Sequence, residues 1–131
     1  MNNWIVRLKQ ANIYQEKLLV LEQVDLSIAA GEFTYLIGKT GSGKSSLLKT
    51  LYGALPLHQG EGNVAGFDLK KLNRKTLPLL RRKLGIVFQD FNLLTDRSVY
   101  DNLAFVLKAT RRQNKKAMEQ HIMQVLEEVG L

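Results

Sequence analysis

One glycine-rich octapeptide constrains this chain more than any other feature. It reads Gly38-Lys39-Thr40-Gly41-Ser42-Gly43-Lys44-Ser45 and satisfies the pattern G-x-x-x-x-G-K-[S/T]. Glycines let a backbone wrap closely around an anion with its N–H groups turned inward, and a helix that begins near Lys44 adds its positive end. We therefore predict a phosphate-binding loop, in which Lys44 reaches the β- and γ-phosphates of a nucleotide and the Ser45 hydroxyl ligates Mg²⁺. Ser46, the next residue, is the last candidate for contact with the nucleotide.

The segments around this loop predict an α/β protein. Residues 33–37 (FTYLI) form a β-prone run that is typical of a strand buried on both faces. A helix is expected over residues 44–52, ended by Gly53. Residues 85–88 (GIVF) are a second candidate for a buried strand. Strands that alternate with helices in this way indicate an α/β architecture.

Shorter patterns predict the remaining elements. Residues 4–8 and 20–28 carry β-type alternation, although Leu21 breaks it in the second segment, and they indicate an N-terminal antiparallel β section. Residues 56–68 are expected to form a loop with a short strand near Asn63. Three further helices are predicted. The first has Leu77, Leu80 and Leu84 on one face and Pro78 in its first turn. The second runs from a capping box at Ser98 to about Thr110, and the third has Met118, Ile122, Val125 and Val129 on one face and ends at Gly130.

Composition excludes several classes of protein. The 131 residues include no Cys, which excludes a disulfide framework, a thiolate metal site and a Cys nucleophile. No apolar run is long enough to span a membrane, and the first residues do not form a signal peptide, so we expect a cytoplasmic protein.

The formal charge of +7 is concentrated in two clusters. They are Lys70, Lys71, Arg74, Lys75, Arg81, Arg82 and Lys83, and Lys108, Arg111, Arg112, Lys115 and Lys116. No aromatic residues for base stacking lie among them, so we interpret both as solvated helix faces and expect no nucleic-acid partner.

Asp90 ends an apolar run and is a candidate for the acid that holds Mg²⁺ in a complete NTPase. The polar Gln89 interrupts that run, and Phe91 stands where a catalytic acid would follow. A role for Gln89 is therefore the better interpretation.

The order of strand, phosphate loop, helix and the sequence Val-Phe-Gln-Asp at 87–90 resembles the nucleotide-binding domain of ABC transporter ATPases. By that resemblance Gln89 is the Q-loop residue, which approaches Mg²⁺ and the attacking water and heads the loop that meets the membrane partner. Tyr14 matches the A-loop aromatic that stacks on adenine, and Val20 matches the apolar residue beside it. Packing under the β section is the alternative for Tyr14. The resemblance implies a P-loop NTPase core of the ABC type, with ATP and Mg²⁺ as cofactors, Lys44 and Gln89 in catalysis, and Ser45 and Gln89 at the metal.

Within the family, residues 80–102 resemble the bacterial cell-division branch, whose ATP-binding subunits are of the FtsE type. This implies two copies that sandwich ATP and drive an FtsX-like integral membrane subunit from the inner face of the cell membrane. Lipoprotein-release and macrolide-export ATPases share part of the stretch and remain the alternative. A non-catalytic nucleotide-binding module is the alternative from another class.

Domains of this family contain further motifs that residues 1–131 lack. The Leu-Ser-Gly-Gly-Gln signature, the Walker B strand with its Mg²⁺ Asp and catalytic Glu, the D-loop and the switch His are absent, and His58 and His121 stand in the wrong places to be that His. We therefore expect residues 1–131 to be the N-terminal part of one ABC ATP-binding domain. The phosphate loop would occupy 38–45, the Q-loop would begin at 89, and the helical subdomain would begin over about 98–131. Such a fragment is expected to hydrolyse no ATP by itself.

The residues after Gln89 are unusually apolar for a loop. Phe91, Leu93, Leu94 and Tyr100 follow the predicted strand and precede or open a capped helix. Apolar side chains in a loop either close a local core or form a docking surface. The resemblance favours docking, because the Q-loop region of the family receives a helix of the membrane subunit.

Overall fold

A computed structural model describes residues 3–110 and 114–131. The chain divides into two compact units, Met1–Gly85 and Ile86–Leu131, and each has its own apolar core. Arg111 and Arg112 of the second basic cluster lie outside the described residues.

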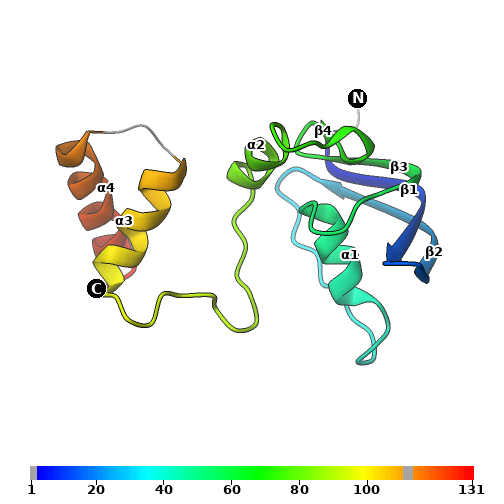
Figure 1. Ribbon diagram of the computed structural model, residues 1–131, viewed down its shortest axis with the longest axis horizontal. Coiled ribbons are helices and arrows are strands. Elements are labelled where there is room, and N and C mark those ends of the chain that lie inside the picture. Colours follow the sequence, from blue (N-terminus) through cyan, green and yellow to red (C-terminus); the bar gives the residue numbers. More distant parts are fainter. Residues whose placement is uncertain (1–2, 111–113) are drawn as a thin grey trace. The chain divides into compact units, whose positions relative to one another are not determined.

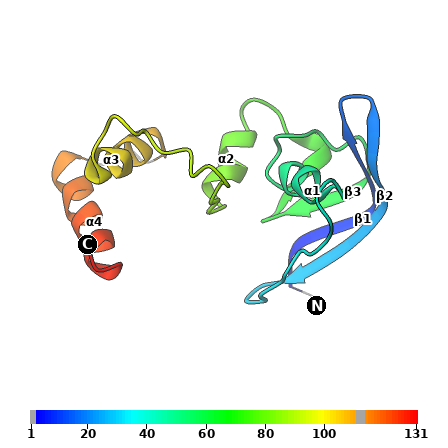
Figure 2. The same cartoon turned by 90° about the horizontal axis from the view of Figure 1, so that it is seen from below.

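The first unit is built on an antiparallel sheet. Its strands are β1 (Trp4–Gln15), β2 (Leu18–Ala29), β3 (Gln59–Val64) and β4 (Phe67–Asp68), in the order β2-β1-β3-β4. Figures 1 and 2 show β1 and β2 as a long curved hairpin with β3 on the other side of β1. The predicted β section is thus confirmed, and its strands are longer than the alternation indicated.

Two β-bulges explain why the alternation was hard to follow. At Gln10 (φ 46°) strand β1 contains one extra residue that has no partner in the β1–β2 ladder, and at Gln23 (φ 48°) strand β2 does the same. Side chains from the opposite strand fix both of them, because Asp25 Oδ1 accepts from Gln10 N at 2.8 Å and Asn12 Oδ1 accepts from Gln23 N at 2.7 Å. A bulge shifts the side-chain register by one, so Leu21 and Val24 both pack against the same core.

Helices cover one face of this sheet and supply three of the eight buried residues of its core, Leu47, Leu69 and Leu80. The helices are α1 (Lys44–Leu51), the 3-10 turn η1 (Leu69–Lys71) and α2 (Leu77–Arg82). Pro78 lies in the first turn of α2, and Gly53 (φ 76°) follows the end of α1, as predicted. The buried residues of this core are Leu8, Ala11, Ile13, Leu47, Leu57, Val64, Leu69 and Leu80.

The second unit is a helix pair formed by α3 (Val99–Thr110) and α4 (Lys115–Glu128), which lie side by side in Figures 1 and 2. Its buried residues are Ala104, Leu107, Met118 and Ile122. The predicted capping box is confirmed, because Ser98 Oγ accepts from Asp101 N at 3.1 Å. The predicted end of the last helix is also confirmed, since Gly130 follows it with a φ of 78°.

The prediction of two buried parallel strands was wrong for this structure. Residues 33–37 and 85–88 form no strand, and Tyr35, Ile37 and Val87 are exposed at 80%, 86% and 87%. Figure 1 draws both segments as plain coil. A parallel strand is held by hydrogen bonds to neighbouring strands, and no described strand pairs with either segment. The β-prone composition alone therefore produced no ladder.

Gly60 offers a test of the sheet. It has a φ of 85° and faces the Gln10 bulge so closely that a Cβ built on it would lie 2.6 Å from Ala11 Cα. We expect Gly60→Ala to lower the free energy of unfolding by about 2–5 kcal/mol, from left-handed strain and overpacking together. Denaturant unfolding followed through the single tryptophan, Trp4, measures this.

Gly66 is the matched control, because its φ of 86° is nearly the same and a Cβ there meets nothing within 4 Å. Gly66→Ala should cost only the backbone strain of about 1–2 kcal/mol. Equal losses in the two variants would contradict close packing at Gly60.

Candidate nucleotide-binding site

The phosphate loop is closed by glycines in the left-handed region. Gly41 has a φ of 81°, and Gly43, the N-cap of α1, has a φ of 96°. Ser42 N donates to Lys39 O at 3.1 Å, which tightens the turn, and Leu47 N makes a helical bond to Gly43 O at 2.9 Å. The N–H groups of Lys44, Ser45 and Ser46 precede that bond, so they are the unpaired donors that the first turn of a helix offers to an anion.

Lys44 folds back over the loop. Its Nζ donates to Gly38 O at 2.5 Å and to Lys39 O at 2.8 Å, with Ser42 Oγ at 3.4 Å. The ammonium is thus held at the mouth of the loop by carbonyls that an incoming phosphate oxygen can replace. The first turn of α1 contains no acidic residue that would repel such an anion. The charge of the loop is therefore compatible with a bound phosphate.

Two serines after Lys44 differ in environment. Ser45 is exposed, so its hydroxyl is available to a metal ion bound with the phosphates. Ser46 is buried, and its hydroxyl donates to Gln15 Oε1 at 3.3 Å, at the end of β1. Ser46 can therefore meet a phosphate through its backbone N–H rather than its hydroxyl.

The hairpin of β1 and β2 forms a wall of the loop. A Cβ built on Gly43 would lie 2.9 Å from Val20 Cγ1 and 2.9 Å from Leu21 Cγ, so only glycine fits there. Val20 is at a register irregularity, because Ile13 pairs with Leu21 while the next residue of β1 pairs with Leu19. The structure thus brings Val20 against Gly43 of the loop, while its predicted place beside the aromatic that stacks on adenine stays a prediction. It adds Leu21 against Gly43 and Gln15 against Ser46. Sequence analysis missed both, although the broken alternation at Leu21 was a signal.

Tyr14 lies in β1 opposite Leu19 and is half-buried. Its hydroxyl donates weakly to Gln59 Oε1 at 3.4 Å, and the same oxygen accepts from Asn12 Nδ2 at 2.7 Å. The ring is therefore tied to β3 by its hydroxyl rather than sealed in the core. Stacking of adenine on Tyr14 stays a prediction.

Gln89 belongs to the second unit and lies exposed in a turn at residues 89–92. Phe91 N donates to Phe88 O at 3.0 Å and Asn92 N to Asp90 O at 2.6 Å, and both donor residues have positive φ values of 57° and 51°. The described residues contain no group of three His, Asp or Glu side chains suited to a metal ion. A role of Gln89 at Mg²⁺ stays a prediction.

The apolar residues after Gln89 separate into two groups. Phe91 and Leu93 are 68% and 64% exposed, whereas Tyr100 packs against the core of the helix pair. Leu94 is half-buried. Tyr100 thus closes a local core, whereas a docking role for the exposed Phe91 and Leu93 stays a prediction.

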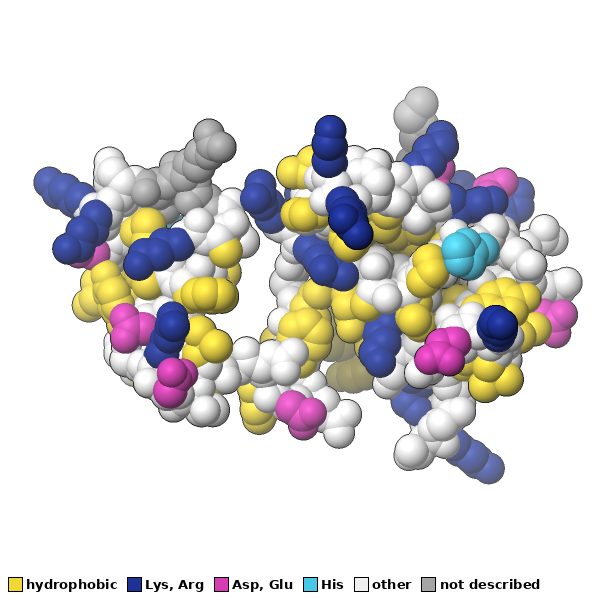
Figure 3. Space-filling view, viewed as in Figure 1, with side chains coloured by type: hydrophobic (Ala, Val, Ile, Leu, Met, Phe, Trp, Pro, Cys, Tyr) yellow, Lys and Arg dark blue, Asp and Glu magenta, His cyan; other side chains and the backbone are white. Residues whose placement is uncertain are grey.

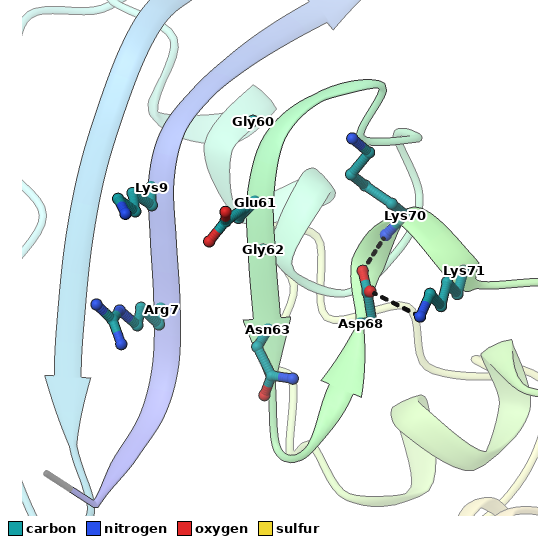
Figure 4. A pocket seen from close by; sticks show the side chains of 9 residues that line it. All are labelled: Arg7, Lys9, Gly60, Glu61, Gly62, Asn63, Asp68, Lys70 and Lys71. Carbon is teal, nitrogen blue, oxygen red and sulfur yellow. Dashed lines mark hydrogen bonds and ion pairs between the residues drawn. The ribbon is translucent and has the colours of Figure 1, made fainter.

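A pocket of about 570 Å³ lies away from the phosphate loop, on β1, β3, β4 and η1 (Figure 4). Its lining carries basic and acidic side chains: Lys9 is opposite Glu61 in the β1–β3 register, and Lys71 Nζ lies 3.8 Å from Asp68 Oδ2. On the face drawn in Figure 3, Lys and Arg side chains are spread over both units rather than gathered in one patch. This distribution agrees with solvated basic clusters.

Comparison with known proteins decides the family. The ABC transporter family model matches residues 21–131. The chain belongs to the ABC transporter family. The resemblance drawn from the phosphate loop and Gln89 is thereby confirmed, and these residues are part of an ABC ATP-binding domain of α/β class.

Curated relatives in this family include the cell division ATP-binding protein FtsE of Streptococcus pneumoniae, which is 39% identical over 118 residues, 90% of this chain and 51% of the relative. FtsE of Mycobacterium tuberculosis is 40% identical over 85% of this chain and 48% of its own length. The methionine import ATP-binding protein MetN of Clostridioides difficile is 35% identical over 97% of this chain and 39% of its own. The chain spans about half the length of the FtsE relatives.

Solved structures of the family share the fold. The dimeric ATP-binding cassette MJ0796, in a post-hydrolysis state with ADP and Pi, matches with a TM-score of 0.78 and 29% identity over 93% of this chain and 56% of its own. CbiO1 of Clostridium perfringens, part of the ABC transporter complex cbiONQ, matches with a TM-score of 0.84 and 26% identity over 98% and 51%.

Proposed function

We propose that this ABC chain binds ATP through residues 38–46 and belongs to an ATP-hydrolysing subunit that drives an FtsX-like membrane partner in cell division. The glycine-rich loop supports the nucleotide part of this proposal, because Lys44 Nζ folds back over it and the first N–H groups of α1 lie at its end. Two FtsE relatives at 39% and 40% identity support the cell-division part.

The residues of the loop have distinct roles in this proposal. Lys44 contacts the β- and γ-phosphates, the N–H groups at the start of α1 bind phosphate oxygens, and Val20 with Tyr14 contacts the base. Bound Mg²⁺ would neutralise charge on the phosphates and would be held by the Ser45 hydroxyl. Two copies would enclose two nucleotides, and the dimeric state of MJ0796 supports this arrangement.

Attachment to a membrane is proposed to occur through the partner. No helix among the described residues combines the length and apolarity that crossing a bilayer requires. We propose a peripheral location on the inner face of the cell membrane. A methionine importer is the second candidate, because MetN relatives reach 35–42% identity with this chain.

Capture of the membrane subunit tests the proposal. We expect the chain to co-purify with an FtsX-like subunit in preference to the membrane subunit of a methionine importer. Phe91→Ser should lower this capture at least about tenfold, since buried aromatic anchors dominate interface energies. Its ATP affinity and melting temperature should stay unchanged, because Phe91 is 68% exposed.

Met123→Ser is the control, because Met123 is 58% exposed on α4, outside the loop. It should leave capture unchanged. Preferred capture of the methionine-type subunit would replace the cell-division assignment with the second candidate. A Phe91→Ser variant that melts early and loses nucleotide would assign Phe91 to core packing instead.

A further inference from the structure

Asn102, in the first turn of α3, makes more side-chain hydrogen bonds than any other residue that the structure describes in the second unit. Its Oδ1 accepts from Leu94 N at 2.8 Å, and its Nδ2 donates to Leu94 O at 3.0 Å and to Ser98 O at 2.9 Å, with Arg97 O at 3.5 Å. The side-chain amide thus pairs with both backbone groups of Leu94, as a neighbouring strand would. Sequence analysis gave this residue no role.

Only an amide of this length can make these bonds. The contact uses one acceptor and both N–H donors of the side chain, and Asn and Gln alone combine them. Aspartate keeps the acceptor and loses both donors, whereas alanine loses all three. Leu94 O also accepts from Arg97 N at 3.2 Å, so Asn102 closes a turn that is already formed over residues 94–97.

The closed turn lies directly beside the exposed apolar residues. Leu93, 64% exposed, immediately precedes Leu94, and Phe91, 68% exposed, lies three residues before it. Phe91 and Asn92 both have positive φ, a conformation that asparagine tolerates but that costs phenylalanine about 1–2 kcal/mol. Such strain persists only where the surrounding structure over-determines the backbone, and it is typical of functional sites.

We propose that Asn102 is the positioning residue of the docking loop, residues 91–98. Its amide fixes Leu94 to the start of α3, and Phe91 and Leu93 are thereby held in the shape that an apolar helix of the membrane subunit contacts. This inference rests on the docking role proposed for Phe91. It adds the residue that sets the conformation of the loop before a partner arrives.

Two measurements on the isolated chain test the hydrogen bonds. In Asn102→Ala, hydrogen exchange of the Leu94 amide and tryptic cleavage after Arg97 should both accelerate about tenfold or more, as expected when local hydrogen bonds no longer hold a segment closed. In Asn102→Asp, the Leu94 amide should stay protected while cleavage after Arg97 accelerates, because only the donors are lost. This second variant also preserves volume, so it remains informative should the alanine variant fold poorly.

Ser98→Ala is the matched control. It removes the hydroxyl that caps Asp101 N but leaves every bond between Asn102 and Leu94 in place. Exchange at Leu94 and capture of the FtsX-like subunit should both stay near wild type. If Ser98→Ala loosened Leu94 as much as Asn102→Ala did, Asn102 would act only through the stability of α3 and the proposal would be overturned.

Capture of the partner separates this inference from the function on which it rests. We expect Asn102→Ala to reduce capture at least about tenfold with an unchanged melting temperature and unchanged ATP affinity. A loosened loop with wild-type capture would overturn the positioning role while leaving the partner assignment intact. A wild-type chain that captures no membrane subunit would overturn the docking function, whatever exchange at Leu94 shows about the loop.

Discussion

Replacing Lys44 with alanine is expected to weaken ATP binding by roughly 10- to 150-fold. The Lys44 ammonium is the charged group held at the mouth of the loop by Gly38 O and Lys39 O, and a phosphate would take over this contact. Hydrogen bonds to charged groups contribute about 1.5–3 kcal/mol each, which corresponds to that loss in affinity. Titration calorimetry with Mg²⁺-ATP measures it.

Lys49→Ala makes the same change of charge in the last turn of the same helix. Its affinity should stay within about threefold of wild type, because a charge at the far end of α1 is screened and makes no phosphate contact. Equal losses in both variants would show that net charge, rather than the position of Lys44, governs binding. Equal affinities of wild type and Lys44→Ala would remove the phosphate loop from nucleotide binding.

Hydrolysis shows the largest expected deficit. We expect residues 1–131 to bind ATP and to turn it over no faster than background. Positioning the attacking water and stabilising the transition state contribute orders of magnitude in rate, about 10³-fold or more. No described segment combines a buried strand with a following catalytic Glu, and Asp90 lies exposed in the turn at 89–92.

A phosphate-release assay on the chain and on Asp90→Asn tests this expectation. Both should match a blank that lacks protein, and Lys44→Ala serves as the control for contaminating ATPases. Turnover that is abolished by Asp90→Asn would show that Asp90 holds Mg²⁺ and that these residues form a working NTPase.

Local sequence determined the turns of the glycine-rich loop and several helix ends. The turn at Gly41 and Gly43, the start of α1 at Lys44 and its end before Gly53 each depend on residues within one or two turns of chain. The same holds for the capping box at Ser98 and for the glycine that follows α4. Conformational preferences of glycine and helix caps act over such short distances, so a single sequence predicts them.

Tertiary structure decided the features that depend on distant partners. Residues 33–37 and 85–88 have strand-like composition, but a ladder needs neighbours, and the described strands provide none for them. The bulges at Gln10 and Gln23 are fixed by Asp25 and Asn12 across the hairpin, and no local pattern shows such bonds.

Two contacts near the proposed sites arose in the same way. Leu21 reaches the phosphate loop because a register irregularity turns that part of β2 toward Gly43. Asn102 bonds Leu94 eight residues earlier because the chain turns over residues 94–97 and then enters α3. Sequence determined which chemistry the chain carries, since residue types set donors, charges and backbone freedom. The fold determined which of these groups meet, since contacts between separated residues depend on the path of the whole backbone.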